Sequence, residues 1–301
     1  MRIGYACLTV NVPNTDIKRC RLKNANDERL ADIIGHTLNS LENTLDYNMK
    51  NGIRLFRISS DLIPFGSSPE IRLPWWDIYE YWLKSIGDRI RNYGMRVSMH
   101  PGQYTILNAE RKSIIEKSVD DLAFHTRVLD SMQLSPEHKI VLHVGGVYNN
   151  KKKSMERFIE SCKCLSSSIR QRLVIENDDK CYSVKDILTI SNLLDIPVVY
   201  DNLHNKVNPG DLLKSDAEWI KICRKTWHSE DGVQKIHYSR QAPGKSPGAH
   251  ADSIRVDDFT AFFNTVKNME IDIMLEVKDK NLSALKCIEA VRNTTDKNYT
   301  D

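Results

Sequence analysis

The segment Arg172-Leu173-Val174-Ile175-Glu176 contains a short apolar run that ends on a carboxylate. Uninterrupted apolar runs of this length are typical of strands buried on both faces, as in a parallel sheet. Five other segments repeat the pattern, each ending on a histidine, an aspartate or a glutamate. They are the runs 96–99, 139–142, 197–200, 234–236 and 271–275, which end on His100, His143, Asp201, His237 and Glu276. The repetition predicts six buried parallel strands, each with a metal-binding residue type at its C-terminal end.

The shared position of these six polar residues predicts a common site. In a closed parallel barrel the C-terminal ends of the strands surround one opening, here called the barrel mouth, where active sites lie. A single strand-end histidine is ordinarily a hydrogen-bonded core residue, and a single aspartate is ordinarily a helix cap. Three imidazoles and three carboxylates buried together would instead need a cation to offset the cost of burying them. The pattern therefore indicates a hydrolytic metalloenzyme.

Strands and helices alternate eight times along the chain, without a linker or a low-complexity segment. Two earlier strands, at residues 2–6 and 55–59, precede the six above. Helices are expected near residues 27–51, 75–93, 111–133, 151–170, 183–194, 211–226, 257–268 and 282–292. Gly94 is expected to end the second helix in the left-handed conformation.

Eight such units in 301 residues predict an α/β fold, a (β/α)₈ TIM barrel forming one domain over residues 1–301. An open doubly wound sheet is the alternative. Its sites, however, do not draw on six consecutive strand ends.

The composition is that of a globular protein from a reducing compartment. Charged residues make up 28% of the chain and hydrophobic residues 41%. No segment approaches the roughly 18 consecutive apolar residues of a membrane span. The chain begins directly with a strand rather than a signal sequence, and its seven cysteines lack zinc-type spacing. We therefore expect a cytoplasmic protein with free thiols and no membrane partner.

The net charge of +3 is too small to indicate nucleic-acid binding by itself. The run Lys151-Lys152-Lys153 is more informative, because it follows the strand that ends on His143 and so belongs on the rim of the barrel mouth. It either begins a solvated helix or adds positive charge toward a polyanionic substrate. The sequence leaves both interpretations open.

Further donors extend the predicted metal site. His204 lies one turn beyond Asp201, and His250 lies in the loop after the seventh strand. Together these donors exceed what one ion takes, and nitrogen and oxygen donors without thiolate favour Zn²⁺ or Mn²⁺. Two ions that share a carboxylate are the usual arrangement for phosphodiester cleavage. Glu176, central in strand order, is the expected bridge. The remaining histidines lie on or beside predicted helices and are interpreted as surface or structural: His36, His125, His138 and His228.

Several segments, taken in order, resemble the UV-damage endonuclease family. They are Ser98-Met99-His100-Pro101-Gly102-Gln103-Tyr104, Leu142-His143-Val144-Gly145-Gly146, Val174-Ile175-Glu176-Asn177-Asp178, Asp201-Asn202-Leu203-His204, Lys235-Ile236-His237 and Pro247-Gly248-Ala249-His250. With Gly4-Tyr5 and Leu275-Glu276-Val277-Lys278, they cover nearly the whole chain. The set is highly specific, although each piece alone would be weak.

The resemblance implies a metal-dependent DNA-repair barrel related to endonuclease IV. Such enzymes nick double-stranded DNA immediately 5′ to a UV photoproduct and leave 3′-hydroxyl and 5′-phosphate ends. The implied lesions are cyclobutane pyrimidine dimers and 6-4 photoproducts, with abasic sites as a further candidate. The implied cofactor is a cluster of three divalent ions, usually Mn²⁺, with Zn²⁺ and Mg²⁺ as the other candidates.

The resemblance also implies roles for individual residues. The expected ligands are His100, His143 and Glu176 for one ion, Glu176, Asp201, His237 and Glu276 for a second, and His204 with His250 for a third. Catalytic roles fall on Glu176, His237 and Lys235. Lys235 matches a family lysine that can be carboxylated.

A second group of residues is expected to bind the lesion. Gln103 and Tyr104 match the pair that fills the gap left when damaged nucleotides are extruded. Tyr5 matches a residue of the lesion pocket, and Asn11 is the nearest candidate for a family asparagine. Ser68 stands where the family usually has histidine. This departure is expected to change lesion affinity or rate and to spare the metal site.

Two other functions compete with the repair endonuclease. A sugar isomerase-like barrel would also use strand-end carboxylates and histidines, but it predicts no DNA-probing aromatic such as Tyr104. A non-catalytic damage-binding protein would have no use for a complete ligand set. We expect a monomer whose partner is double-stranded DNA containing UV lesions.

Overall fold

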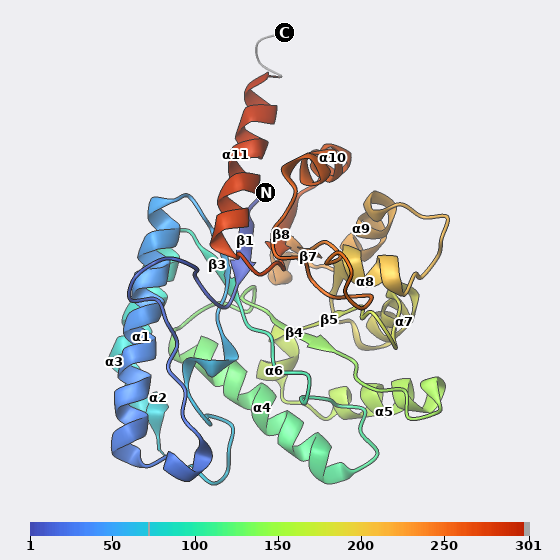
Figure 1. Ribbon diagram of the computed structural model, residues 1–301. Coiled ribbons are helices and arrows are strands. Elements are labelled where there is room, and N and C mark those ends of the chain that lie inside the picture. Colours follow the sequence, from blue (N-terminus) through green and yellow to red (C-terminus); the bar gives the residue numbers. More distant parts are fainter. Residues whose placement is uncertain (72, 298–301) are drawn as a thin grey trace.

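The computed structural model describes residues 1–71 and 73–297, and within them a single parallel sheet forms the centre of the molecule (Figure 1). The strand order is β3-β2-β1-β8-β7-β6-β5-β4. The strands are β1 (Ile3–Ala6), β2 (Leu55–Arg57), β3 (Arg96–Ser98), β4 (Ile140–His143), β5 (Leu173–Glu176), β6 (Val198–Asp201), β7 (Gln234–Tyr238) and β8 (Ile271–Leu275).

The two edge strands of this sheet meet and close it into a nearly complete barrel. Met99, directly after β3, forms a parallel bridge with Ile140 of β4. The Met99 amide donates to the Lys139 carbonyl at 3.0 Å, and the Val141 amide donates to the Met99 carbonyl at 3.0 Å. The predicted TIM-barrel fold is therefore confirmed.

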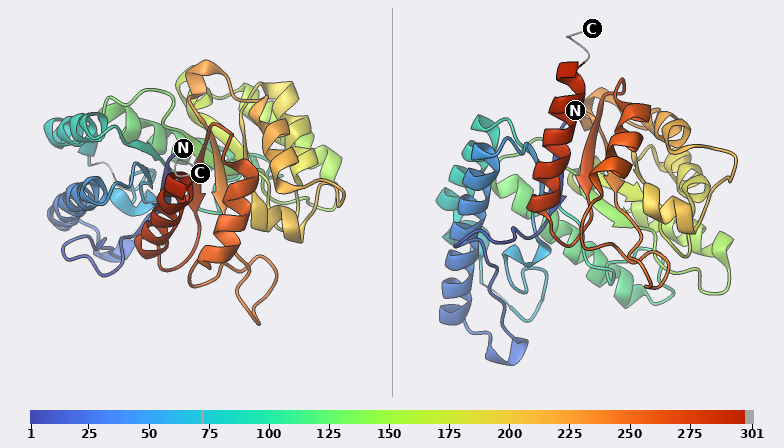
Figure 2. Two further views of the ribbon diagram at one scale, coloured as in Figure 1. Left: turned by 90° about the horizontal axis from the view of Figure 1, so that it is seen from above. Right: turned by 45° about the horizontal axis from the view of Figure 1, so that its top comes forward.

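Helices pack around the outside of the strands (Figure 2). Five of them lie close to the expected ranges: α1 (Asp27–Lys50), α4 (Lys112–Ser131), α7 (Val184–Leu194), α10 (Val256–Val266) and α11 (Asn281–Lys297). Gly94 ends the second helical segment with φ +57°, as predicted. No helix of the described residues is long and apolar enough to cross a membrane.

Three expected helices differ from the structure in extent. The segment 75–93 breaks into α2 (Trp75–Ile78) and α3 (Glu80–Asn92), and 151–170 breaks into α5 (Lys151–Lys163) and α6 (Ser167–Arg172). Ser166 causes the second break, because its side chain accepts from the Ile169 amide and begins a new helix. The third expected helix, 211–226, is shorter in the structure and forms α9 (Asp216–Arg224). A short helix α8 (Asn202–Val207) precedes it. The described residues also include three 3₁₀ turns, η1 (Leu22–Asn24), η2 (Ser60–Leu62) and η3 (Ser229–Asp231).

The barrel interior is apolar in the middle and charged at the end opposite the mouth. Val141, Val174, Val199 and Trp227 form one interior cluster. Beyond them lies an ionic floor, defined here as Arg96, Lys139, Asp231 and Asp272. Arg96 pairs with Asp272 at 3.0 Å, and Lys139 pairs with Asp231 at 2.5 Å. This floor closes the barrel below the predicted site.

The cysteines take no part in cross-linking the fold. All seven lie within the described residues, and all are free thiols.

Candidate metal centre

The predicted ligands of strands β3 to β8 converge at the barrel mouth. Neighbouring strands place His143 opposite Glu176 and Asp201 opposite His237. Potential metal-ligating atoms form two compact groups, and within each group all of them lie within 4.8 Å of one another. The first group is His100, His143 and Glu176, and the second is Glu176, Asp201 and His237. Glu176 belongs to both groups, so the structure brings the predicted first and second ion sites together around one carboxylate.

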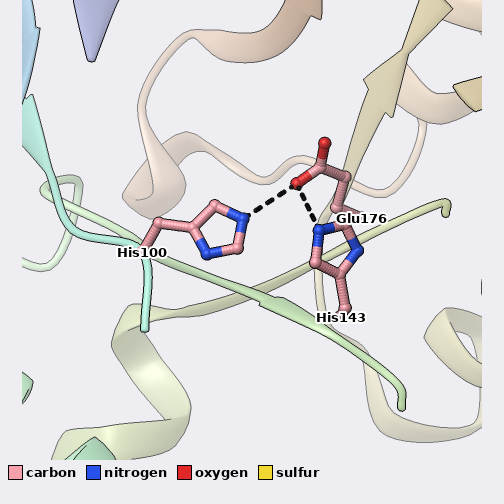
Figure 3. Close-up of side chains that lie close together, drawn as sticks. All are labelled: His100, His143 and Glu176. Carbon is pink, nitrogen blue, oxygen red and sulfur yellow. Dashed lines mark hydrogen bonds and ion pairs between the residues drawn. The ribbon is translucent and has the colours of Figure 1, made fainter. Parts of the chain in front are cut away.

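The two oxygens of Glu176 face different imidazoles. Its Oε2 lies 3.2 Å from Nε2 of His100 and 3.5 Å from Nε2 of His143 (Figure 3). Its Oε1 lies 2.8 Å from Nδ1 of His237 and 3.5 Å from Nδ1 of His204. A carboxylate placed in this way can bridge two cations.

The remaining predicted ligands lie on the other side of His237. Nδ1 of His237 is 3.1 Å from Oε1 of Glu276, and Nδ1 of His250 is 3.8 Å from Oε2 of Glu276. The rings of His204 and His250 have centroids 6.1 Å apart. All eight predicted ligands therefore belong to one continuous cluster.

Local backbone features position the two histidines that do not come directly from strand ends. Asp201 caps α8 by accepting from the His204 amide at 2.7 Å, which places His204 beside the carboxylates. Gly248, in the loop that carries His250, has φ +86°, and a Cβ there would lie 2.3 Å from Oδ2 of Asp179. Glycine thus permits the close approach of this loop.

Burial and mutual charge shift the acidity of the site. Burial alone would raise the pKa of Glu176, but the imidazoles of His237 and His143 hold it well below its usual value. Burial raises the pKa of Asp201 to about 7, opposed by His204 and reinforced by the carboxylates of Glu176 and Glu276. Burial would lower the pKa of His204, yet Asp201 and Glu176 raise it to about 9. The cluster thus concentrates negative charge that positive groups must balance.

Several buried nitrogen and oxygen atoms of the predicted ligands lack hydrogen-bond partners among the described residues. Nε2 of His237, Nδ1 of His143 and Oδ2 of Asp201 make no hydrogen bond there. Buried polar atoms are normally satisfied, so each orphan atom needs an explanation. Imidazole nitrogens and carboxylate oxygens are ligands for Zn²⁺ and Mn²⁺. The donor set therefore fits a divalent metal cluster.

Two basic residues of the barrel interior flank the ligands. Lys235 is 0% exposed, and its Nζ makes no hydrogen bond to the described residues. Burial, reinforced by Arg96 and Arg57, lowers the pKa of Lys235 well below its usual value. Arg57, at the end of β2, pairs with Glu276.

Arg57 was not among the residues predicted from the sequence, because the expected second strand ran on to Ser59. With the observed boundary, Arg57 is another polar residue at a strand end. A rule widened from metal-binding residue types to any polar residue at a strand end would have found it.

The predicted probe residues lie on the rim. Gln103 is exposed, and the Tyr104 side chain is 68% exposed. Tyr104 borders a cavity of about 280 Å³ that is also lined by Ser68 and Phe124. Ser68, whose hydroxyl accepts from the Glu70 amide at 3.3 Å, therefore lies apart from the metal ligands and beside Tyr104.

Tyr5 and Asn11 are not brought to the metal centre. Tyr5 is 0% exposed, and its hydroxyl donates to Oδ1 of Asn48 on α1 at 2.8 Å. The side chain thus packs between the barrel and α1, and its contact with the lesion stays a prediction. Asn11 is exposed on the loop after β1, with φ +60°.

The lysine run begins a helix on the mouth side of the barrel, and its contact with a polyanionic substrate stays a prediction. Asn150 caps α5 by accepting from the Lys153 amide, so the run does begin a helix. It also lies on the mouth side, because α5 follows the C-terminal end of β4. Lys151 is paired with Asp186 at 2.5 Å, whereas Lys152 and Lys153 are exposed.

The histidines left out of the site have other partners. His36 pairs with Asp16, His228 pairs with Asp195, and His138 accepts from the Val97 amide at 3.1 Å. His125 is fully buried on α4.

Comparison with known proteins places this geometry in a family. A family model described as UV-endonuclease UvdE matches residues 1–299. A UV DNA damage endonuclease of Clostridium perfringens (strain 13 / Type A) is 42% identical over 293 residues, 97% of this chain and 71% of the relative. One of Bacillus cereus (strain Q1) is 32% identical over 268 residues, 88% of this chain and 84% of the relative.

Solved structures agree with the sequence relatives. The crystal structure of SacUVDE has a TM-score of 0.93 and 41% identity, covering 98% of this chain and 99% of that one. Endonuclease IV from Thermus thermophilus has a TM-score of 0.60 at 14% identity, covering 97% and 100% of the two chains. The latter likeness shows the fold alone. The match over nearly the whole chain, together with these relatives, establishes that this chain belongs to the UV-endonuclease UvdE family.

Proposed function

We propose that this protein incises double-stranded DNA immediately 5′ to UV photoproducts and leaves 3′-hydroxyl and 5′-phosphate ends. As a member of its family it is a DNA endonuclease of UV-damage repair. The proposed substrates are cyclobutane pyrimidine dimers, 6-4 photoproducts and abasic sites. The observation that carries the proposal is the carboxylate of Glu176, whose two oxygens face separate groups of imidazoles.

The proposed cofactor is a cluster of Mn²⁺ ions. His100, His143 and Glu176 would hold one ion, Glu176, Asp201, His237 and Glu276 a second, and His204 with His250 a third. When bound, such ions supply an activated water and stabilise the departing oxygen of the cleaved phosphodiester. Zn²⁺ and Mg²⁺ are the other candidates.

The residues of this chain contribute orientation and charge. Oε1 of Glu176 faces His237 at 2.8 Å, so the carboxylate holds that imidazole in one orientation. The Asn177 carbonyl lies 2.9 Å from Nδ1 of His204 and orients its ring. Arg57 pairs with Glu276 and limits its rotation. These contacts prepare the donors before substrate binds.

The proposed role of Lys235 is to become an additional anion beside the cluster. Its neutral amine would attack carbon dioxide, form an N–C bond and lose one proton, which leaves a carbamate. The buried, unpartnered Nζ and its lowered pKa support this role. Native mass spectrometry at raised bicarbonate should show an added mass that is absent from Lys235→Arg.

The rim residues complete the proposed recognition of damage. Gln103 would contact orphaned base edges, and Tyr104 would stack on a base. Ser68, beside Tyr104 in the same cavity, would modulate lesion affinity.

The competing functions have less support. Solved sugar epimerases share the fold at about one-tenth identity, as for D-psicose 3-epimerase from Clostridium cellulolyticum H10 with 10% identity and a TM-score of 0.57. A likeness at this identity shows a shared fold and gives no support for epimerase activity in this protein. A non-catalytic damage binder would have no use for the orphan donors of the cluster. We further propose that the protein is a single-domain monomer that acts in the cytoplasm.

A nicking assay tests the proposal. UV-irradiated supercoiled plasmid should be converted to the nicked form with added Mn²⁺, and unirradiated plasmid should not. Mapping the ends on a defined duplex then tests the 5′ position and the end chemistry. Equal nicking of both plasmids, or none of either, would contradict the proposal.

A further inference from the structure

The buried face of α4 carries three polar side chains toward the rim. Ser118, Asp121 and His125 are 2%, 4% and 0% exposed, and their spacings of three and four residues place them on one helical face. Ser118 and Asp121 form hydrogen bonds with residues 100–106, called here the probe loop. His125 contacts Ser60, which lies beside that loop. This loop begins at the metal ligand His100 and contains the proposed probe residues Gln103 and Tyr104.

One end of the probe loop is held through His125. Nδ1 of His125 lies 2.7 Å from the Asp121 carbonyl and therefore carries a proton that it donates. Its Nε2 lies 3.0 Å from the Ser60 hydroxyl. The Ser60 hydroxyl also lies 2.8 Å from the His100 carbonyl, and its one proton is donated either to Nε2 of His125 or to this carbonyl. Thus α4 is connected through Ser60 to the backbone of a metal ligand.

The other end of the probe loop is held through Asp121 and Ser118. The Thr105 hydroxyl donates to Oδ2 of Asp121 at 2.6 Å, and the Ile106 amide donates to the Ser118 hydroxyl at 2.9 Å. The Thr105 amide donates to the Gly102 carbonyl at 2.9 Å and closes a turn around the probe residues. The exposed probe therefore sits on a turn anchored by buried polar contacts.

Anchoring of this kind matters for recognition. A probe on a mobile loop would lose conformational freedom on binding, and that loss would weaken its discrimination between damaged and intact DNA. Hydrogen bonds to a buried carboxylate are stronger than neutral ones. The Thr105–Asp121 contact is of that kind.

We propose that Asp121 and Thr105 are positioning residues for lesion discrimination. On the same helix, His125 acts through Ser60 to fix the loop relative to the metal centre. The polar face of α4 thereby holds the probe and His100 at one separation. The proposal rests on the proposed probing role of Gln103 and Tyr104.

Thr105→Val tests the probe end, because it keeps the shape and removes the donor. The ratio of affinities for damaged and intact duplex should fall roughly tenfold, the size expected for one lost charge-assisted hydrogen bond. Amide exchange of residues 102–106 should accelerate, while metal content stays at the wild-type level. Thr105→Ser, which keeps the hydroxyl, should show the wild-type affinity ratio and the wild-type rate of amide exchange.

Ser60→Ala tests the metal end. Loss of a contact that orients a ligand typically lowers metal affinity roughly tenfold or more. Equilibrium binding of Mn²⁺ to the purified protein measures this change without reference to activity. His125→Gln should have the same effect.

His138→Gln is the matched control. His138 is also a buried histidine, 4% exposed, but it contacts the Val97 amide at the opposite end of the barrel. The variant should melt at a lower temperature yet keep wild-type discrimination and Mn²⁺ affinity. If this control loses as much discrimination or Mn²⁺ affinity as the α4 variants, the α4 contacts contribute only to overall stability. That result would overturn the proposal.

The outcomes separate this proposal from the probing role on which it rests. If Thr105→Val keeps wild-type discrimination and wild-type exchange, the positioning role is wrong. If Gln103→Ala/Tyr104→Ala keeps wild-type discrimination, the probing role fails instead. Exchange in Thr105→Val then still decides whether α4 holds the loop.

Discussion

At the scale of single residues, Glu176 is the carboxylate shared by the two donor groups. It is 1% exposed, and glutamine in its place would keep the size while removing the negative charge. We predict that Glu176→Gln raises the barrier by about 3 kcal/mol or more, roughly a hundredfold in incision rate. Incision of damaged plasmid and bound metal per protein measure the effect. Glu160→Gln, an exposed glutamate on α5, is the control. A Glu176→Gln rate within tenfold of wild type would contradict the bridging role.

Gln103 and Tyr104 are also residue-scale features, since their side chains are exposed on the rim. Stacking on one base is worth about 1–3 kcal/mol. We predict that Gln103→Ala/Tyr104→Ala weakens binding to damaged duplex roughly tenfold to a hundredfold and leaves metal content unchanged. Fluorescence anisotropy with damaged and intact duplexes measures this. Loss of metal in the double variant would show that the pair is structural. Ser68→His, which introduces the usual family residue beside Tyr104, should raise affinity or rate on the same substrate.

At the scale of elements, the start of α5 places lysines on the mouth side of the barrel. Each phosphate contact contributes about 0.9 to the slope of log affinity against log salt concentration. Because Lys151 is already paired with Asp186 at 2.5 Å, the contribution should come from Lys152 and Lys153. We predict that changing both to alanine reduces the slope by about 2 for damaged and intact DNA alike.

Two lysines at the far end of α9 provide the matched control for this element. Lys221 and Lys225 are exposed, and the end of α9 lies on the side of the barrel opposite the mouth. Lys221→Ala/Lys225→Ala should leave the salt dependence at its wild-type value. If both double variants change the slope equally, the effect reflects net charge rather than a contact at α5.

At the scale of the whole molecule, the closed barrel buries groups whose protonation depends on folding. Burial, reinforced by Arg96 and Arg172, lowers the pKa of His138 to about 3 from its ordinary 6.5. Below pH 6.5 the unfolded chain therefore binds a proton that the folded protein excludes, so stability falls as pH falls. Between pH 6.5 and pH 5 this group should lower the free energy of unfolding by about 2 kcal/mol.

Urea unfolding at both pH values measures this loss. His138→Gln removes the titrating group, so the variant should lose less stability than wild type over the same interval. An identical loss in the two proteins would assign the pH dependence to other buried groups.

Most of the proposed metal ligands could be predicted because their signal is local. Six of the eight lie at the end of a short apolar run, and the strands of a parallel barrel all end on one side. His100, Glu176 and Glu276 are therefore neighbours in space despite their separation in the chain. Chain order and strand ends were sufficient for these six, so the sequence by itself determined the barrel and most residues of the proposed cluster.

Other features depended on which face of a strand looks inward. Strands buried on both faces are apolar throughout, so their composition does not mark the inner side. The family resemblance places Tyr5 in the lesion pocket, and only the packed structure shows its hydroxyl against Asn48 of α1. The contacts of α4 with the probe loop are likewise tertiary. They join Ser60, Thr105 and His125, and only the packing of α4 against the segments after β2 and β3 brings those residues together.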